Sequence, residues 1–295
     1  MTTMDMDYDA AQALVEEIAR RISSDTRKPA VAFRLEKRRK RKSDLLGSFL
    51  GGDSYWSPGG VPVTAEDGSP LYPLAQIRCS ELNLPGYPTQ GLLQFLIGTD
   101  DLYGCALSAS YDSEAGNGNW CVRYIPTVPE VLAADEVVTL PHIERGSGNS
   151  SDSGKELSTP FEKGFHGRAL RAERIEQAAE NLYCDEFEPA YWRVIGQFDP
   201  EMIEEADIIL DDLQEAVVDH LYVESAASSI QVGGYPVFTQ SDVRSDYDNE
   251  LVLLKVDSVS RVLMWGDSGC ANFLIRRNDL ERLDFSHVLY TWDCL

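Results

Sequence analysis

Two stretches of this sequence match each other: Gly91-Leu-Leu-Gln-Phe-Leu-Ile-Gly-Thr-Asp-Asp-Leu102 and Gly269-Cys-Ala-Asn-Phe-Leu-Ile-Arg-Arg-Asn-Asp-Leu280. Six of the twelve aligned positions are identical, and Gln94 corresponds to its close analogue Asn272. The first stretch holds a short, nearly continuous apolar run, which is typical of a strand covered on both faces. The match therefore predicts two similar strands far apart in the chain.

Further matches lie upstream of both stretches, in the same order. Ala75-Gln-Ile77 corresponds to Leu254-Lys-Val256, and each copy also has a Gly-Gly pair, Gly51-Gly52 and Gly233-Gly234. The sequence therefore predicts an internal duplication, with repeats over about 48–125 and 230–294, and two copies are too few for a solenoid. We expect one α+β, β-rich domain over 1–295, in which two similar β-sheet halves share a core and helices flank the sheets.

Other segments carry helix, strand and loop patterns. The apolar stripe over 10–22 predicts a helix, and the alternation over 31–35 predicts a strand. The Gly- and Ser-rich composition of 143–157 predicts a flexible loop. Apolar spacing then predicts two helices, over 170–182 and 203–221.

The charge of the chain is strongly negative. Its 49 acidic residues against 26 basic ones give a formal net charge of −23, which disfavours nucleic acid and anionic membranes and favours basic partners. The alternative is a general acidic bias that serves solubility alone. The block of six cations over 37–42 is interpreted as a solvated loop or a polyanion site.

Targeting patterns are absent from the sequence. The first residues lack a basic region followed by an apolar one, and no apolar run approaches the length of a membrane-spanning helix. Six scattered cysteines without a C-x-x-C pair are typical of reduced thiols. We therefore expect a cytoplasmic protein without a membrane-spanning segment.

One predicted helix has an acid-only polar face. Nine acidic residues and no lysine or arginine lie between Glu201 and Glu224, so like charges four residues apart repel one another. A partner's cations would relieve that repulsion, although a solvated face in salt is the alternative. The candidate partner-binding residues are Asp207, Asp211, Asp212 and Glu215.

Several blocks in both halves resemble the YwqG-like family. They include Ser48-Phe-Leu-Gly-Gly52, Gly233-Gly-Tyr-Pro236, Met264-Trp-Gly-Asp-Ser-Gly269 and Asp284-Phe-Ser-His-Val-Leu-Tyr-Thr-Trp-Asp-Cys294. The resemblance implies a mixed fold with duplicated β-structure and no assigned activity. Lys255 stands where the family usually has glutamine, so we do not expect two equivalent ligand sites.

The usual catalytic motifs are missing or stand in the wrong context. Gly266-Asp-Ser-Gly269 is the tetrapeptide around a trypsin-like nucleophile, but no histidine has the required setting. The histidines and cysteines lack metal-ligand spacing, and no phosphate-binding glycine loop occurs. The sequence therefore predicts no catalytic residue, metal or cofactor. The polar and aromatic members of the repeat blocks are the candidate ligand-binding residues: Gln94, Arg123, Tyr235, Trp265 and Asp267.

Two functional hypotheses follow from the sequence. The favoured one is a non-enzymatic, cytosolic binding or immunity-like protein whose acidic surface takes a basic protein partner. The alternative is a small-molecule-binding protein or hydrolase with its site between the two repeats. The oligomeric state is not predicted.

Overall fold

The computed structural model describes most of the chain. The described ranges are 6–39, 44–55, 63–65, 67–69, 71–105, 119–129, 137–138, 158–225, 227–246 and 248–295. The predicted loop over 143–157 and the end of the basic block, 40–42, lie outside them.

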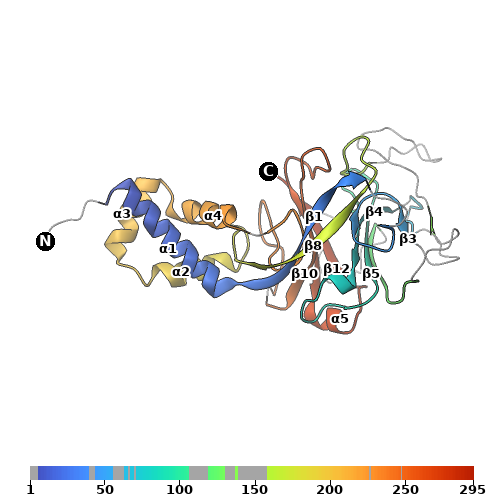
Figure 1. The fold of residues 1–295 in the computed structure, drawn as a ribbon. Coiled ribbons are helices and arrows are strands. Elements are labelled where there is room, and N and C mark those ends of the chain that lie inside the picture. Colours follow the sequence, from blue (N-terminus) through green and yellow to red (C-terminus); the bar gives the residue numbers. More distant parts are fainter. Residues whose placement is uncertain are drawn as a thin grey trace.

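A ten-stranded sheet forms the larger part of the molecule (Figure 1). Its strands run in the order β12-β11-β10-β9-β1-β8-β2-β4-β5-β6, and all neighbours are antiparallel. Their bounds are β1 (Lys28–Arg39), β2 (Phe49–Leu50), β4 (Tyr72–Arg78), β5 (Leu92–Ile97), β6 (Trp120–Ile125), β8 (Arg168–Gln177), β9 (Ile230–Gly233), β10 (Glu250–Asp257), β11 (Cys270–Arg276) and β12 (Val288–Asp293). A separate ladder pairs β3 (Ser54–Tyr55) with β7 (Val137–Val138).

The paired strands β1 and β8, which we call the central ribbon, lie in the middle of the sheet. Nine register pairs run along it, from Lys28 opposite Gln177 to Arg39 opposite Arg168. On one side of the ribbon lie β9, β10, β11 and β12, and on the other lie β2, β4, β5 and β6. The two strands therefore join the two groups of four.

Aromatic side chains from both groups meet in one core inside the curled sheet. Phe95 on β5 contacts Phe273 on β11 edge to face, with ring centroids 5.1 Å apart. Trp120 on the edge strand β6 packs on Tyr290 of the other edge strand, β12, at 6.0 Å. The sheet is thus nearly closed through side-chain packing between its edges.

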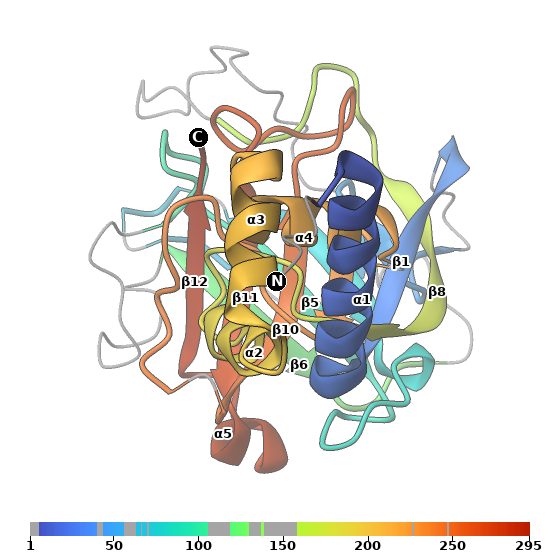
Figure 2. The ribbon, with the colours of Figure 1, turned by 90° about the vertical axis from the view of Figure 1, so that its left-hand side faces the viewer.

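Four helices form an arm with its own core. The helices α1 (Tyr8–Thr26), α2 (Phe187–Ile195), α3 (Pro200–Leu210) and α4 (Leu213–Val223) pack around Ile18, Phe187 and Val217. They project from one side of the sheet (Figure 1) and lie in front of it in Figure 2. The short α5 (Arg277–Glu281) follows directly after β11. The α+β class and the β-rich content are confirmed, but four of the described helices form an arm on one side and do not flank two sheet halves.

The predicted helix over 170–182 is wrong. Residues 168–177 form strand β8, which pairs with β1 along its whole length. The segment is rich in Ala, Arg and Glu, which favour helices. Backbone pairing on both sides overrides that preference, because β8 lies between β1 and β2.

The predicted single helix over 203–221 is also wrong in extent. It is divided into α3 and α4 at Asp211, whose φ is 65°. Asp212 then accepts a hydrogen bond from Glu215 N at 2.9 Å and caps α4. The helix α2 was not predicted, whereas the helix over 10–22 and the strand over 31–35 are confirmed as parts of α1 and β1.

The Phe95–Phe273 contact leads to a stability prediction. Phe273→Ala should lower the free energy of unfolding by about 3–5 kcal/mol, because it opens a cavity between the two groups of strands. Val243→Ala is the control, since Val243 is 44% exposed, and should change it by less than about 0.5 kcal/mol. Urea denaturation measures both, and equal effects would contradict the shared core.

Candidate functional site

A buried ion network lies where the arm meets the sheet. The guanidinium of Arg244 donates from Nε to Asp242 Oδ1 at 3.0 Å and from Nη1 to Glu186 Oε1 at 3.1 Å. Glu186 Oε1 also accepts a hydrogen bond from Lys28 Nζ, at 2.8 Å. The side chains of Arg244 and Asp242 are 2% and 0% exposed, so each of these two charges is compensated by the other groups of the network.

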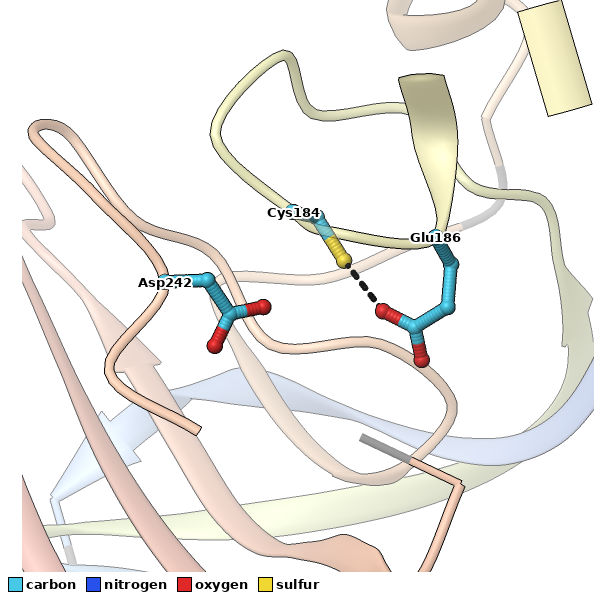
Figure 3. A group of neighbouring side chains, drawn as sticks. All are labelled: Cys184, Glu186 and Asp242. Carbon is cyan, nitrogen blue, oxygen red and sulfur yellow. Dashed lines mark hydrogen bonds between the residues drawn. The ribbon is translucent and has the colours of Figure 1, made fainter. Parts of the chain in front are cut away.

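The same network contains a convergent set of possible metal ligands. Cys184, Glu186 and Asp242 hold one ligand atom each within 4.8 Å of one another (Figure 3). However, Arg244 Nη2 lies 3.4 Å from Cys184 Sγ and contacts both carboxylates. A metal ion would have to displace this guanidinium, so we assign the group to an ion network and not to a metal centre.

Burial keeps Cys184 in its thiol form. Desolvation, followed by the negative charge of Glu186, raises the pKa of Cys184 well above its usual value. Its thiol donates to Glu186 Oε2 at 2.9 Å. A thiol that is 1% exposed and protonated is a poor nucleophile.

Beside the network, amide side chains connect the sheet to the arm. Gln231 on β9 donates to Gln177 Oε1 at the end of β8, at 2.6 Å. Gln177 in turn donates to Glu180 Oε1 at 2.8 Å. Gly234 has a φ of 70°, and a Cβ there would lie 2.3 Å from Gln177 Oε1, so the second Gly-Gly pair makes room for this chain of hydrogen bonds.

Two carboxyl groups and one ammonium lie next to these amides. Lys255 on β10 is 2% exposed and its Nζ lies 3.3 Å from Asp257 Oδ2. Burial raises the pKa of Glu180, and hydrogen bonds from Ser225 and Gln177, followed by the charge of Lys255, partly oppose that rise. Burial likewise raises the pKa of Asp257, and the charge of Lys255 and its hydrogen bond partly oppose that rise. Gln76, which the sequence match aligns with Lys255, instead donates to the backbone oxygens of Leu45 and Gly47.

The predicted ligand-binding residues have three different sets of neighbours. Gln94 and Arg123 are register partners on β5 and β6, and Gln94 donates to Tyr55 O at 2.7 Å. Tyr235 lies at the root of the arm, where its hydroxyl donates to Thr26 O.

The remaining two predicted residues lie near the C-terminal end of the chain. Trp265 is buried against Tyr103 and Trp292, with ring centroids 5.6 and 6.1 Å away. Asp267 is exposed in the following turn, where its backbone oxygen accepts from Leu295 N. The structure thus pairs Gln94 with Arg123 and places the other three apart from them.

Three of the predicted partner-binding acids line a groove on the arm. It measures about 700 Å³ and lies between α2, α3 and α4. We call it the arm groove; its lining includes Tyr191, Trp192, Ile195, Phe198, Ile203, Glu204, Asp207, Asp211 and Asp212. Glu215 lies in the first turn of α4, exposed and outside this lining.

Two hollows lie between the edge strand β6 and the residues 280–286 that precede β12, where the alternative hypothesis places a site. They measure about 600 and 530 Å³ and share Tyr124, Pro126 and Leu283. Among the described residues that line them, Glu281 is the one carboxylate and no histidine occurs. None of the five predicted ligand-binding residues lines either hollow.

A model of a family described as a domain of unknown function (DUF1963) matches residues 48–294. The chain belongs to this family. The matched range begins after α1 and β1, although β1 is a central strand of the sheet. No curated protein matches the chain significantly. Over the described residues, every helix is too short or too polar to cross a membrane.

Sequence reasoning missed the ion network and the aromatic wall of the arm groove. Cys184, Glu186, Asp242 and Arg244 come from two segments without a recognisable motif. Tyr191-Trp192 was the available signal for the groove, because paired aromatics close to an acid-rich segment are typical of interfaces. That signal has meaning only once α2 is known to pack beside α3 and α4.

The ion network predicts a specific pH dependence. Burial tends to raise the pKa of Glu186, but hydrogen bonds and charge attraction from Arg244 outweigh it and lower the pKa to about 2. A carboxyl whose pKa is lower in the folded state stabilises that state at pH values above its pKa in the unfolded chain, which is near 4.5. This stabilisation is lost as the pH falls through the pKa of the folded state. Arg244→Met should lower the free energy of unfolding at pH 7 by about 3–5 kcal/mol.

The difference between Arg244→Met and the natural chain should shrink as pH falls from 4.5 towards 2. Without Arg244, burial favours the neutral form of the Glu186 carboxyl. Lower pH should therefore stabilise the folded variant while it destabilises the natural chain. Denaturant unfolding at several pH values measures the difference. Arg34→Met is the control, because Arg34 and Glu173 are 43% and 50% exposed. A gap that stays constant with pH would contradict the assignment.

Proposed function

We propose that this protein is a non-enzymatic binding protein that holds a cationic protein partner in the arm groove. The observation that carries the proposal is the combination of an aromatic wall with a carboxylate rim in one hollow of about 700 Å³. Charge complementarity favours a basic partner.

The carboxylates keep most of their acceptor capacity although two of them also cap the backbone. Asp207 Oδ1 accepts from Leu213 N and Asp212 Oδ1 accepts from Glu215 N, both at 2.9 Å. Each carboxylate has roughly four acceptor positions, so most remain available to a partner's lysine or arginine. Fixed by these bonds, the two side chains lose little further freedom on binding.

The negative field of the rim reaches the floor of the groove. Burial and the charges of Asp207 and Asp212 raise the pKa of Tyr191 to about 12. The same field that disfavours a phenolate favours an ammonium or guanidinium group. Cations entering the groove are therefore attracted and anions are repelled.

The apolar wall supplies affinity that charge alone does not. Trp192 is 56% exposed, and large exposed aromatics of this kind are enriched among the residues that dominate binding. Its Nε1 donates to Glu188 Oε1 at 3.1 Å, which holds the ring in place. A partner that pairs an apolar side chain with a lysine or arginine fits both halves of the groove.

A partner of this chemistry is consistent with an immunity-like role in the cytoplasm, in which the acidic arm neutralises a basic toxin or nuclease. Acidic surfaces speed such encounters at low ionic strength. The sheet would then serve as the support of the arm.

We also infer that this support arose by internal duplication. The groups β2-β4-β5-β6 and β9-β10-β11-β12 follow the same order outward from the central ribbon. Their hairpins shift register at corresponding places, between Pro73 and Ala75 and between Val252 and Leu254. These correspondences support the inference drawn from the two sequence repeats.

A binding experiment with charge-neutral variants tests the proposed function. The probe is a fluorescent amphipathic peptide of leucine and lysine, about 18 residues long so that it can form a helix on binding. Asp207→Asn with Asp212→Asn should weaken its binding about tenfold, because two attractive charges are lost. Asparagine also caps helices well, so the fold of α4 should be retained.

The matched control is Asp7→Asn, which makes the same change at the cap of α1, where Asp7 accepts from Ala10 N. It should leave peptide affinity unchanged. Trp192→Ala should also weaken peptide binding. Added salt should lower the peptide affinity of the natural chain more than that of the double variant. Equal affinities for the natural chain and the double variant would exclude the arm groove as the site.

A further inference from the structure

Another hollow lies at the root of the arm, on the side of α1 and α4. It measures about 320 Å³, within the range of small-molecule sites. We call it the root cavity; its lining comprises Glu16, Ala19, Arg20, Ser23, Arg27, Glu176, Ala178, Glu180, His220, Leu221, Glu224 and Ser225. It shares no residue with the lining of the arm groove.

The root cavity has a buried carboxyl at its floor. Glu180 is 6% exposed and is held by the side chain of Gln177, which links it to β9 through Gln231. The lining residues Ala19, Ala178 and Leu221 are buried and uncharged. The carboxyl is therefore fixed in orientation before any ligand arrives.

Charges of both signs surround this floor. Glu16, Glu176 and Glu224 are exposed at the rim, as are Arg20 and Arg27. The Arg20 guanidinium is already bound to Glu17 at 2.8 Å. Arg27 follows the last turn of α1. Within the described part of the chain, no ion pair involves its guanidinium.

We propose that the root cavity binds a basic α-amino acid. Arg27 would take the carboxylate of the ligand, and Glu180 with the rim carboxylates would take its two cationic groups. The excess of carboxylates over guanidiniums disfavours an acidic ligand, and the few apolar lining residues disfavour a large apolar one.

Isothermal titration calorimetry with the full chain and three related probes tests the proposal. L-arginine carries all three charged groups, agmatine lacks the carboxylate, and citrulline lacks the side-chain charge. L-arginine should bind at least about tenfold more tightly than either of the others, since each lacks one charge-assisted hydrogen-bonding group.

Two variants assign the contacts. Glu180→Gln should weaken L-arginine binding about tenfold or more while keeping the hydrogen bond from Gln177. Arg27→Gln, at the exposed rim, should weaken L-arginine but leave agmatine unchanged, and it provides the test should Glu180→Gln fold poorly. Glu173→Gln is the matched control on β8, because Glu173 lies outside the cavity lining, and should change nothing.

The possible results separate clearly. Absence of L-arginine binding to the natural chain would overturn the proposal, as would binding that neither Glu180→Gln nor Arg27→Gln weakens. Equal affinities for L-arginine and agmatine would overturn the carboxylate contact at Arg27. Asp207→Asn with Asp212→Asn should leave L-arginine binding intact, so the arm groove and the root cavity are tested independently.

Discussion

The arrangement of arm and sheet depends on one buried guanidinium. Arg244, 2% exposed, contacts Asp242 in the segment after β9 and Glu186 just before α2. Buried charges cost several kcal/mol each unless they are paired and hydrogen-bonded, so this contact is stabilising only while all its members are in place. Lys28, at the start of β1, adds a second cation to Glu186. The network thereby connects the start of β1 and the segment before α2 with the segment between β9 and β10.

The sheet and the arm differ in what they offer a ligand. The sheet curls until its edge strands meet through Trp120 and Tyr290, and the amide nitrogens of Gln76 and Gln94 donate to backbone oxygens. The arm has a small core of its own and carries the acidic groove and the root cavity. Under the proposed function, the arm would bind the partner and the sheet would support the arm.

The sequence predicts the strands well where the apolar pattern is local. The segments 92–97 and 270–276, which match in sequence, are recognisable as strands because both of their faces are buried and their residues are mostly apolar. The helix-like composition of β8 misleads, because its pairing with β1 joins residues more than a hundred positions apart. The acidic residues of the groove were identified as a candidate interface, but its aromatic wall depends on how α2 packs. Arg244 and Glu180 have no local signal, since their roles arise from contacts between distant segments.

Hydrogen exchange of the full chain with the leucine–lysine peptide tests the central claim most directly, namely that the arm is the binding part. Amide protection reports where a ligand orders or covers the backbone. Binding in the arm groove predicts slower exchange over 191–214, with the edge strands β6 and β12 unchanged. Protection confined to β6, β12 or the residues 280–286 would contradict the claim and place the partner between the sheet edges.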